Sequence, residues 1–115
     1  MKRPLTEIEI GLIRQVAERL PRHKQEQLLD DLAHAQAEPA TSDGSRTTFD
    51  ISGYQRPPYR GQHSFGVEGE LRDRDGAKLS FDVFADENGR LLELEIVRWG
   101  DGNLIDPDWS TLKLY

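Results

Sequence analysis

The sequence predicts an α+β fold in which an N-terminal helical hairpin packs on one face of a four- to five-stranded antiparallel sheet. Two patterns lead to this prediction. Apolar residues recur at helical spacing within residues 1–36, and they alternate with polar residues through much of 47–115. A chain of 115 residues suits one domain with one modest core.

Two consecutive helices are expected in the first third of the chain. Thr6 is a suitable N-cap residue, and Glu9 three positions later completes a capping box. Pro21 ends the first helix or opens the second, which is predicted over residues 22–36. The apolar stripe of the first helix consists of Ile8, Leu12, Ile13, Val16 and Leu20.

The rest of the chain predicts an antiparallel meander. Residues 37–46 are expected to form a loop because they lack large apolar side chains, and 52–63 another because Pro57 and Pro58 cannot donate backbone hydrogen bonds. The predicted strands are "TTFDI", "SFGVEGEL", "KLSFDVF", "RLLELEIVRW" and "WSTLKLY".

The turns between the central strands predict their register. Residues 73–77 fit a three-residue hairpin loop with Gly76 in the left-handed conformation, which sets Leu71 opposite Leu79 and Gly69 opposite Phe81. A four-residue loop over 86–89 is expected to set Leu94 opposite Phe81. Both hairpins then bury their apolar residues on one face, as burial requires.

The other face of these strands is predicted to be open and acidic. In the predicted register Glu68, Asp82 and Glu93 form one row, and like charges opposed across strands destabilise a sheet. Three explanations stand side by side: screening by arginines folded over the patch, docking of a basic partner, or a metal site. The five acids are Glu68, Glu70, Asp82, Glu93 and Glu95, and the screening arginines would be Arg72, Arg90 and Arg98.

Composition narrows the class of function. The net charge is -6, and residues 62–115 hold twelve acids against six Lys and Arg, which disfavours nucleic acid and favours a basic protein partner. The absence of cysteine excludes disulfides and thiol chemistry. No apolar run approaches the roughly 20 residues that span a bilayer, and no signal-peptide pattern is present, so we expect no membrane association and a cytoplasmic location.

No motif typical of catalysis is present, so we expect no catalytic residue, no metal and no cofactor. A small metal-dependent hydrolase that uses the sheet carboxylates is the alternative hypothesis. A second candidate surface for partner binding is the loop that carries Tyr54, Arg56 and Tyr59, because aromatic and arginine side chains are enriched at protein interfaces.

Several motifs resemble a family of small, single-domain bacterial proteins of uncharacterised function. They are the start Arg3-Pro4-Leu5-Thr6, the turn Asp73 to Gly76 and the strand Gly89 to Ile96, with Gly102, Ile105 and Pro107 in the tail. In size, acidity and predicted topology the chain is also similar to immunity proteins of contact-dependent growth inhibition and related polymorphic toxin systems. This resemblance implies a non-enzymatic protein that binds a cognate toxin domain, commonly a basic nuclease, and covers its active site with the acidic face.

Overall fold

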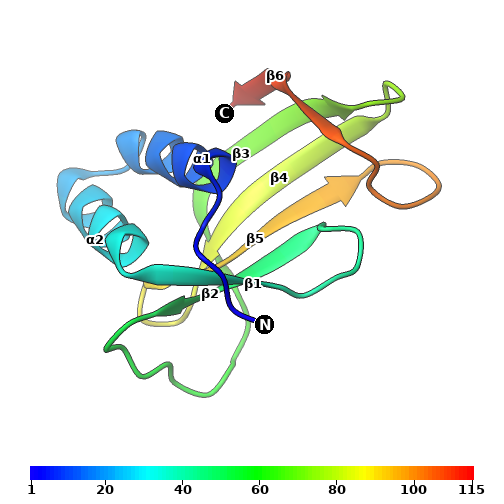
Figure 1. Ribbon diagram of the computed structural model, residues 1–115. Coiled ribbons are helices and arrows are strands. Elements are labelled where there is room, and N and C mark those ends of the chain that lie inside the picture. Colours follow the sequence, from blue (N-terminus) through cyan, green and yellow to red (C-terminus); the bar gives the residue numbers. More distant parts are fainter.

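Two helices precede a six-stranded antiparallel sheet in the computed structural model, which describes residues 1–115 (Figure 1). This architecture confirms the predicted α+β class, with six strands in place of the four or five expected. The elements are α1 (Glu7–Glu18), α2 (Arg22–Ala33), β1 (Ala35–Pro39), β2 (Arg46–Ile51), β3 (His63–Asp73), β4 (Lys78–Ala85), β5 (Leu91–Arg98) and β6 (Pro107–Leu114).

The start of α1 is held by the predicted capping box. The Glu9 N–H donates to the Thr6 hydroxyl at 3.1 Å, and the Thr6 N–H donates to the Glu9 carboxylate at 2.8 Å. The same carboxylate binds both terminal nitrogens of Arg3, at 2.8 and 3.0 Å. Because the Arg3 backbone also pairs with Ala37 of β1, the capping box connects the helix to the edge of the sheet.

The second helix is shorter than predicted, and a strand follows it almost immediately. The predicted helix over 22–36 ends at Ala33, and β1 occupies part of the segment 37–46 that was predicted to be a loop. The backbone of β1 pairs with β2, and Ala37 is fully buried. Its sequence, "AQAEP", contains no β-branched or aromatic residue, so tertiary pairing overrides a weak local preference.

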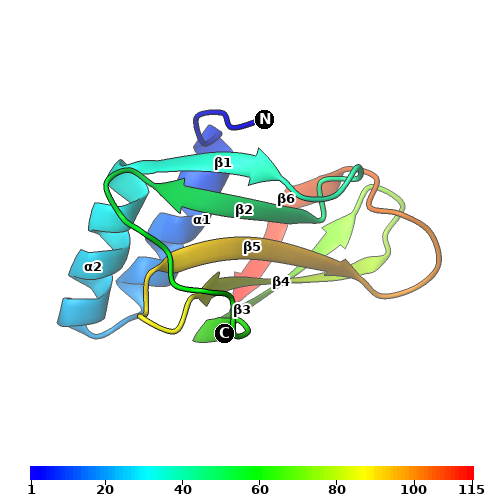
Figure 2. The same cartoon turned by 90° about the horizontal axis from the view of Figure 1, so that it is seen from below.

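The strands are arranged in the order β1-β2-β5-β4-β3-β6. Strands β3, β4 and β5 form the predicted meander, but β2 pairs with β5, and β6 pairs with β3. The full meander predicted for 47–115 is therefore wrong, because residues 52–62 carry the chain to the far side of β5. Both helices lie on one face of the sheet (Figure 2), and apolar residues of the helices and sheet form one core there.

The predicted register of the first hairpin is confirmed. Leu71 pairs with Leu79 and Gly69 with Phe81, and the Gly76 φ of 88° has the left-handed value that the turn requires. A Cβ atom at Gly69 would lie 1.9 Å from a ring carbon of Phe81, so the ring covers the space that a side chain would fill. The fully buried Phe81 is thus accommodated by the missing side chain opposite it.

The predicted register of the second hairpin is wrong by two residues. The Asp86 N–H donates to the Arg90 carbonyl, so the loop has three residues where four were predicted. An irregularity next to Ala85 then adds one residue to β5, and Phe81 pairs with Ile96 where Leu94 was expected. Because the two changes sum to an even shift, residues 93–96 keep their predicted faces. At the irregularity itself Leu91, and not Leu92 as predicted, belongs to the core.

Candidate functional site

The sheet face opposite the helices, which we call the open face, carries a row of three carboxylates. Glu68 of β3 pairs with Asp82 of β4, and Asp82 pairs with Glu95 of β5. The predicted row contained Glu93 in the place of Glu95, and the corrected register accounts for the exchange. Cross-strand neighbours have Cβ atoms about 4.5–5.5 Å apart, so three negative charges lie side by side.

The row continues to Arg46 of β2, the cross-strand partner of Glu95, and this cation offsets only part of the charge because its guanidinium binds Glu93. Glu68, Asp82 and Glu95 form no ion pair, whereas Glu70 binds Lys78 at 3.1 Å. Burial raises the pKa of Asp82 above its ordinary value. The charges of Glu68 and Glu95 add to this effect, against a hydrogen bond from the Ser64 hydroxyl. Repulsion from Glu68 and Glu95 therefore disfavours the charged form of Asp82.

Two of the three arginines that were predicted to screen the row are engaged elsewhere. Arg90 binds Asp31 of α2 at 2.7 Å. Arg98 binds Asp73 and Asp75 at the turn between β3 and β4, at 2.8 and 2.6 Å. The third, Arg72, forms no ion pair. None of the three predicted arginines therefore forms an ion pair with the acidic row.

A hollow of about 370 Å³ lies over the row. The Trp99 side chain borders it, with an exposed fraction of 59%, and its indole N–H donates to the Ser80 hydroxyl at 3.1 Å. The Lys78 ammonium lies 5.4 Å from the Trp99 ring centroid. The lining comprises Glu68, Gly69, Glu70, Lys78, Ser80, Phe81, Asp82, Phe84, Glu95, Val97, Trp99 and Tyr115. Carboxylates and aromatic rings thus share one concave surface.

Glu93 does not belong to this exposed surface, contrary to its predicted position. Its side chain is almost fully buried and binds the Arg46 guanidinium at 2.7 and 2.8 Å. Gln62, at the end of the 52–62 segment, donates a further hydrogen bond to it. Strand alternation gives the correct face for Glu93, but nothing in the local pattern indicates that another segment covers it.

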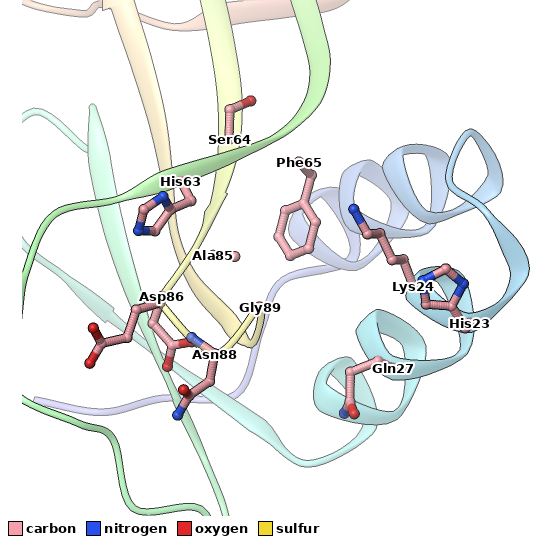
Figure 3. Close-up of a pocket in the computed structure, with 11 residues that line it drawn as sticks. His23, Lys24, Gln27, His63, Ser64, Phe65, Ala85, Asp86, Asn88 and Gly89 are labelled. Carbon is pink, nitrogen blue, oxygen red and sulfur yellow. The ribbon is translucent and has the colours of Figure 1, made fainter.

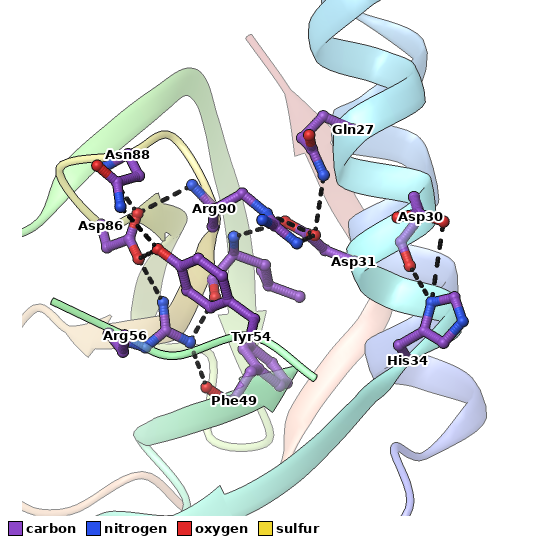
Figure 4. A network of polar contacts seen from close by, with 11 residues as sticks. Gln27, Asp30, Asp31, His34, Phe49, Tyr54, Arg56, Asp86, Asn88 and Arg90 are labelled. Carbon is purple, nitrogen blue, oxygen red and sulfur yellow. Dashed lines mark hydrogen bonds and ion pairs between the residues drawn. The ribbon is translucent and has the colours of Figure 1, made fainter. Parts of the chain in front are cut away.

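The predicted surface around Tyr54, Arg56 and Tyr59 is divided by the structure. The Tyr54 hydroxyl and Arg56 guanidinium donate to the buried Asp86 carboxylate at 2.7 and 2.8 Å (Figure 4). Arg56 also donates to two backbone carbonyls, which fixes this segment to β2 and β5. Only Tyr59 is largely exposed, with an exposed fraction of 66%. The polar groups of Tyr54 and Arg56 form hydrogen bonds within the chain.

Sequence reasoning missed the role of Asp31, although a signal exists. Asp31 lies between Leu28 and Leu32, on the side of α2 that packs inward, and its carboxylate is fully buried. An acid within the apolar stripe of a helix requires an internal partner. Arg90 and the Leu91 N–H supply the partners at the start of β5.

A second hollow, of about 450 Å³, lies between α2 and the β4–β5 turn (Figure 3). His23 and Lys24 border it on one side, and His63 and Glu87 belong to its lining on the other. These side chains carry both signs of charge and define no single ligand chemistry. No group of three or more histidine, aspartate or glutamate side chains is placed to hold a metal ion.

Fold and site together define a small α+β domain that presents a concave acidic sheet face. A model of the DUF6984 family, described as a domain of unknown function, matches residues 2–107, and the chain belongs to this family. The match agrees with the resemblance to a family of uncharacterised function. No curated protein and no solved structure matches the chain. No helix has the length and apolar character needed to cross a membrane.

Proposed function

We propose that this domain is a non-enzymatic protein-binding module that binds a basic partner with its open face. The observation that carries the proposal is the row of Glu68, Asp82 and Glu95, none of which forms an ion pair. The one cation beside the row, Arg46 opposite Glu95, binds Glu93 with its guanidinium. Opposed like charges cost up to about 1 kcal/mol per pair, so the pairs that Asp82 forms with Glu68 and Glu95 destabilise the sheet. A cationic partner surface would supply the missing charge.

The physics of such a contact favours specificity and fast encounter. Complementary charge raises the association rate and disfavours partners of the wrong sign, while the aromatic lining of the hollow contributes contact area. The resemblance to immunity proteins supports the narrower proposal that the partner is a toxin domain, for example a basic nuclease. The open face would then cover the cationic cleft of that toxin.

The test compares two triple variants that change net charge by the same amount. E68Q/D82N/E95Q neutralises the row, whereas E18Q/E26Q/D101N neutralises three exposed acids away from the open face. Partners captured from host lysate by the wild-type protein are identified, purified and titrated against all three proteins at two salt concentrations. We expect at least a tenfold loss of affinity for the row variant, little change for the control variant, and weaker binding at high salt.

Two further results test the narrower proposal that the partner is a toxin domain. Expression of the captured partner alone should arrest growth, and co-expression of the wild-type domain, but not of the row variant, should restore it. Equal affinity of the row variant and the wild-type protein would show that the open face is not the binding surface. A partner that binds through the row without arresting growth would leave a binding module that is not an immunity protein.

A further inference from the structure

We propose that the hollow on the open face receives an arginine side chain of the partner. The guanidinium would stack on Trp99 and donate hydrogen bonds to the carboxylate row. This inference rests on the proposed function, because it names the side chain with which a basic partner binds there.

Aromatic rings and unpaired carboxylates meet in this hollow. Trp99 and Tyr115 are exposed by 59% and 64%, and both border the same concave surface as the row. The Tyr115 backbone exchanges two hydrogen bonds with Glu68, at 2.8 and 3.2 Å, which places this aromatic residue at the end of the row. Exposed rings beside carboxylates are the surroundings that a cation with an apolar face prefers.

A cation of the chain itself already uses this chemistry at one end of the hollow. The Lys78 ammonium lies 3.1 Å from a Glu70 oxygen and 5.4 Å from the Trp99 ring centroid. This contact is independent of the row, and it shows that a carboxylate and an indole hold a positive charge between them here. None of the three carboxylates of the row forms such an ion pair, and the guanidinium of Arg46, opposite Glu95, binds Glu93.

The geometry favours arginine over lysine. Guanidinium is planar and carries five N–H donors, so one group can donate to two adjacent carboxylates while its face contacts a ring. Glu68, Asp82 and Glu95 lie in a line at the spacing of cross-strand neighbours. An ammonium is a compact, strongly hydrated charge, and it gains less from a ring and from two spaced carboxylates. A hollow of about 370 Å³ has room for such a side chain.

The experiment titrates acetylated hexa-arginine and hexa-lysine peptides, which carry equal charge, into the full chain at one ionic strength. Calorimetry gives the affinities, and the assigned indole N–H resonance of Trp99 reports on the stacking. We expect tighter binding of hexa-arginine and a shift of the Trp99 resonance. W99A should weaken hexa-arginine binding by about two- to fivefold and hexa-lysine binding by less, so the preference for arginine should narrow. I8A, at an exposed apolar residue of α1, is the control and should change neither.

A gain-of-affinity variant keeps the test independent of folding defects. K78Q removes the cation that shares Glu70 and Trp99, so hexa-arginine should bind more tightly to it and keep its preference over hexa-lysine. Equal affinities of the two peptides, or no binding of either, would overturn the arginine inference. The proposed function would still stand if the captured partner needs the row. Arginine preference without any basic partner would show that the hollow binds a guanidinium but would remove the proposed function, and with it the partner as the source of the arginine.

Discussion

Asp31 connects α2 to the sheet through a single buried carboxylate. It accepts hydrogen bonds from the Arg90 guanidinium at 2.7 and 2.8 Å and from the Leu91 N–H at 3.0 Å. Gln27, one turn earlier on the helix, donates to the same carboxylate at 3.1 Å. Figure 4 shows these groups converging between the helix and the start of β5. Removal of one partner from such a buried ion pair costs much free energy, because the other charge is left without its partner.

Replacement of Asp31 by alanine should therefore destabilise the fold strongly. D31A leaves the Arg90 charge and the Leu91 N–H without their partner, and we expect the free energy of unfolding to fall by about 3–5 kcal/mol. Urea denaturation measures the loss. The neighbouring D30A is the matched control, because Asp30 is exposed and its carboxylate lies 3.8 Å from the His34 ring. Its effect should stay within about 0.5 kcal/mol. Equal midpoints for both variants would contradict this account of Asp31.

At the scale of elements, the central strands carry a row of like charges that the fold compensates only in part, through the Ser64 hydroxyl on Asp82 and Arg46 opposite Glu95. The pKa of Asp82 is raised by burial, and further by Glu68 and Glu95. A raised carboxyl pKa means that the folded state favours the protonated form. The protonated Asp82 stabilises the folded state at low pH relative to the charged form, and this stabilisation is lost as pH rises through the folded pKa. At neutral pH the charged Asp82 therefore destabilises the sheet.

The D82N variant should consequently be more stable than the wild-type protein at pH 7. Asparagine keeps an oxygen that can accept the Ser64 hydrogen bond and removes the charge. We expect a higher Tm at pH 7 and a difference that shrinks as pH falls toward 3.8, the ordinary value above which the pKa of Asp82 lies. Thermal unfolding at both pH values measures the difference. A lower Tm for D82N at pH 7 would show that the Asp82 charge is stabilising.

The same strands show what the sequence could predict about the fold and the site. Alternation assigns the faces of residues 93–96 correctly because the loop and bulge changes sum to an even shift, but it fails at the bulge, where Leu91 takes the core position predicted for Leu92. The two-residue shift that exchanges Glu95 for Glu93 has no local signal. The positions of the exposed Glu68 and the half-buried Glu95 on the open face could be predicted from one strand each. The burial of Glu93 could not, because Arg46 and Gln62, which cover it, are distant in sequence.

Across the whole molecule, buried carboxylates with lowered pKa values decide how the fold responds to acid. Burial opposes the charge of Asp73, but the N–H groups of Asp106, Ile105 and Arg74 and the Arg98 guanidinium outweigh it and lower the pKa. Burial also opposes the charge of Asp86, and Tyr54, two backbone N–H groups and Arg56 outweigh it there. These two residues fix opposite ends of the sheet, because Asp73 begins one central turn and Asp86 the other.

Stability should consequently be retained down to about pH 4 and lost steeply between pH 4 and 2. A carboxylate with a lowered folded pKa stabilises the fold above its unfolded pKa, and this contribution is lost as pH falls through the folded value. The pKa of Asp75 is held at about 2 by Arg98, and that of Asp43 at about 2 by Ser45, against an ordinary 3.8, which sets this window. Urea midpoints measured from pH 7 to 2 test this window.

The D75N variant should show a shallower fall in stability below pH 3.8 than the wild-type protein. One of the titrating groups is gone, and the asparagine oxygen can still accept a hydrogen bond from the Ala77 N–H. A decline that begins near pH 6 would mean that groups other than these carboxylates control acid unfolding.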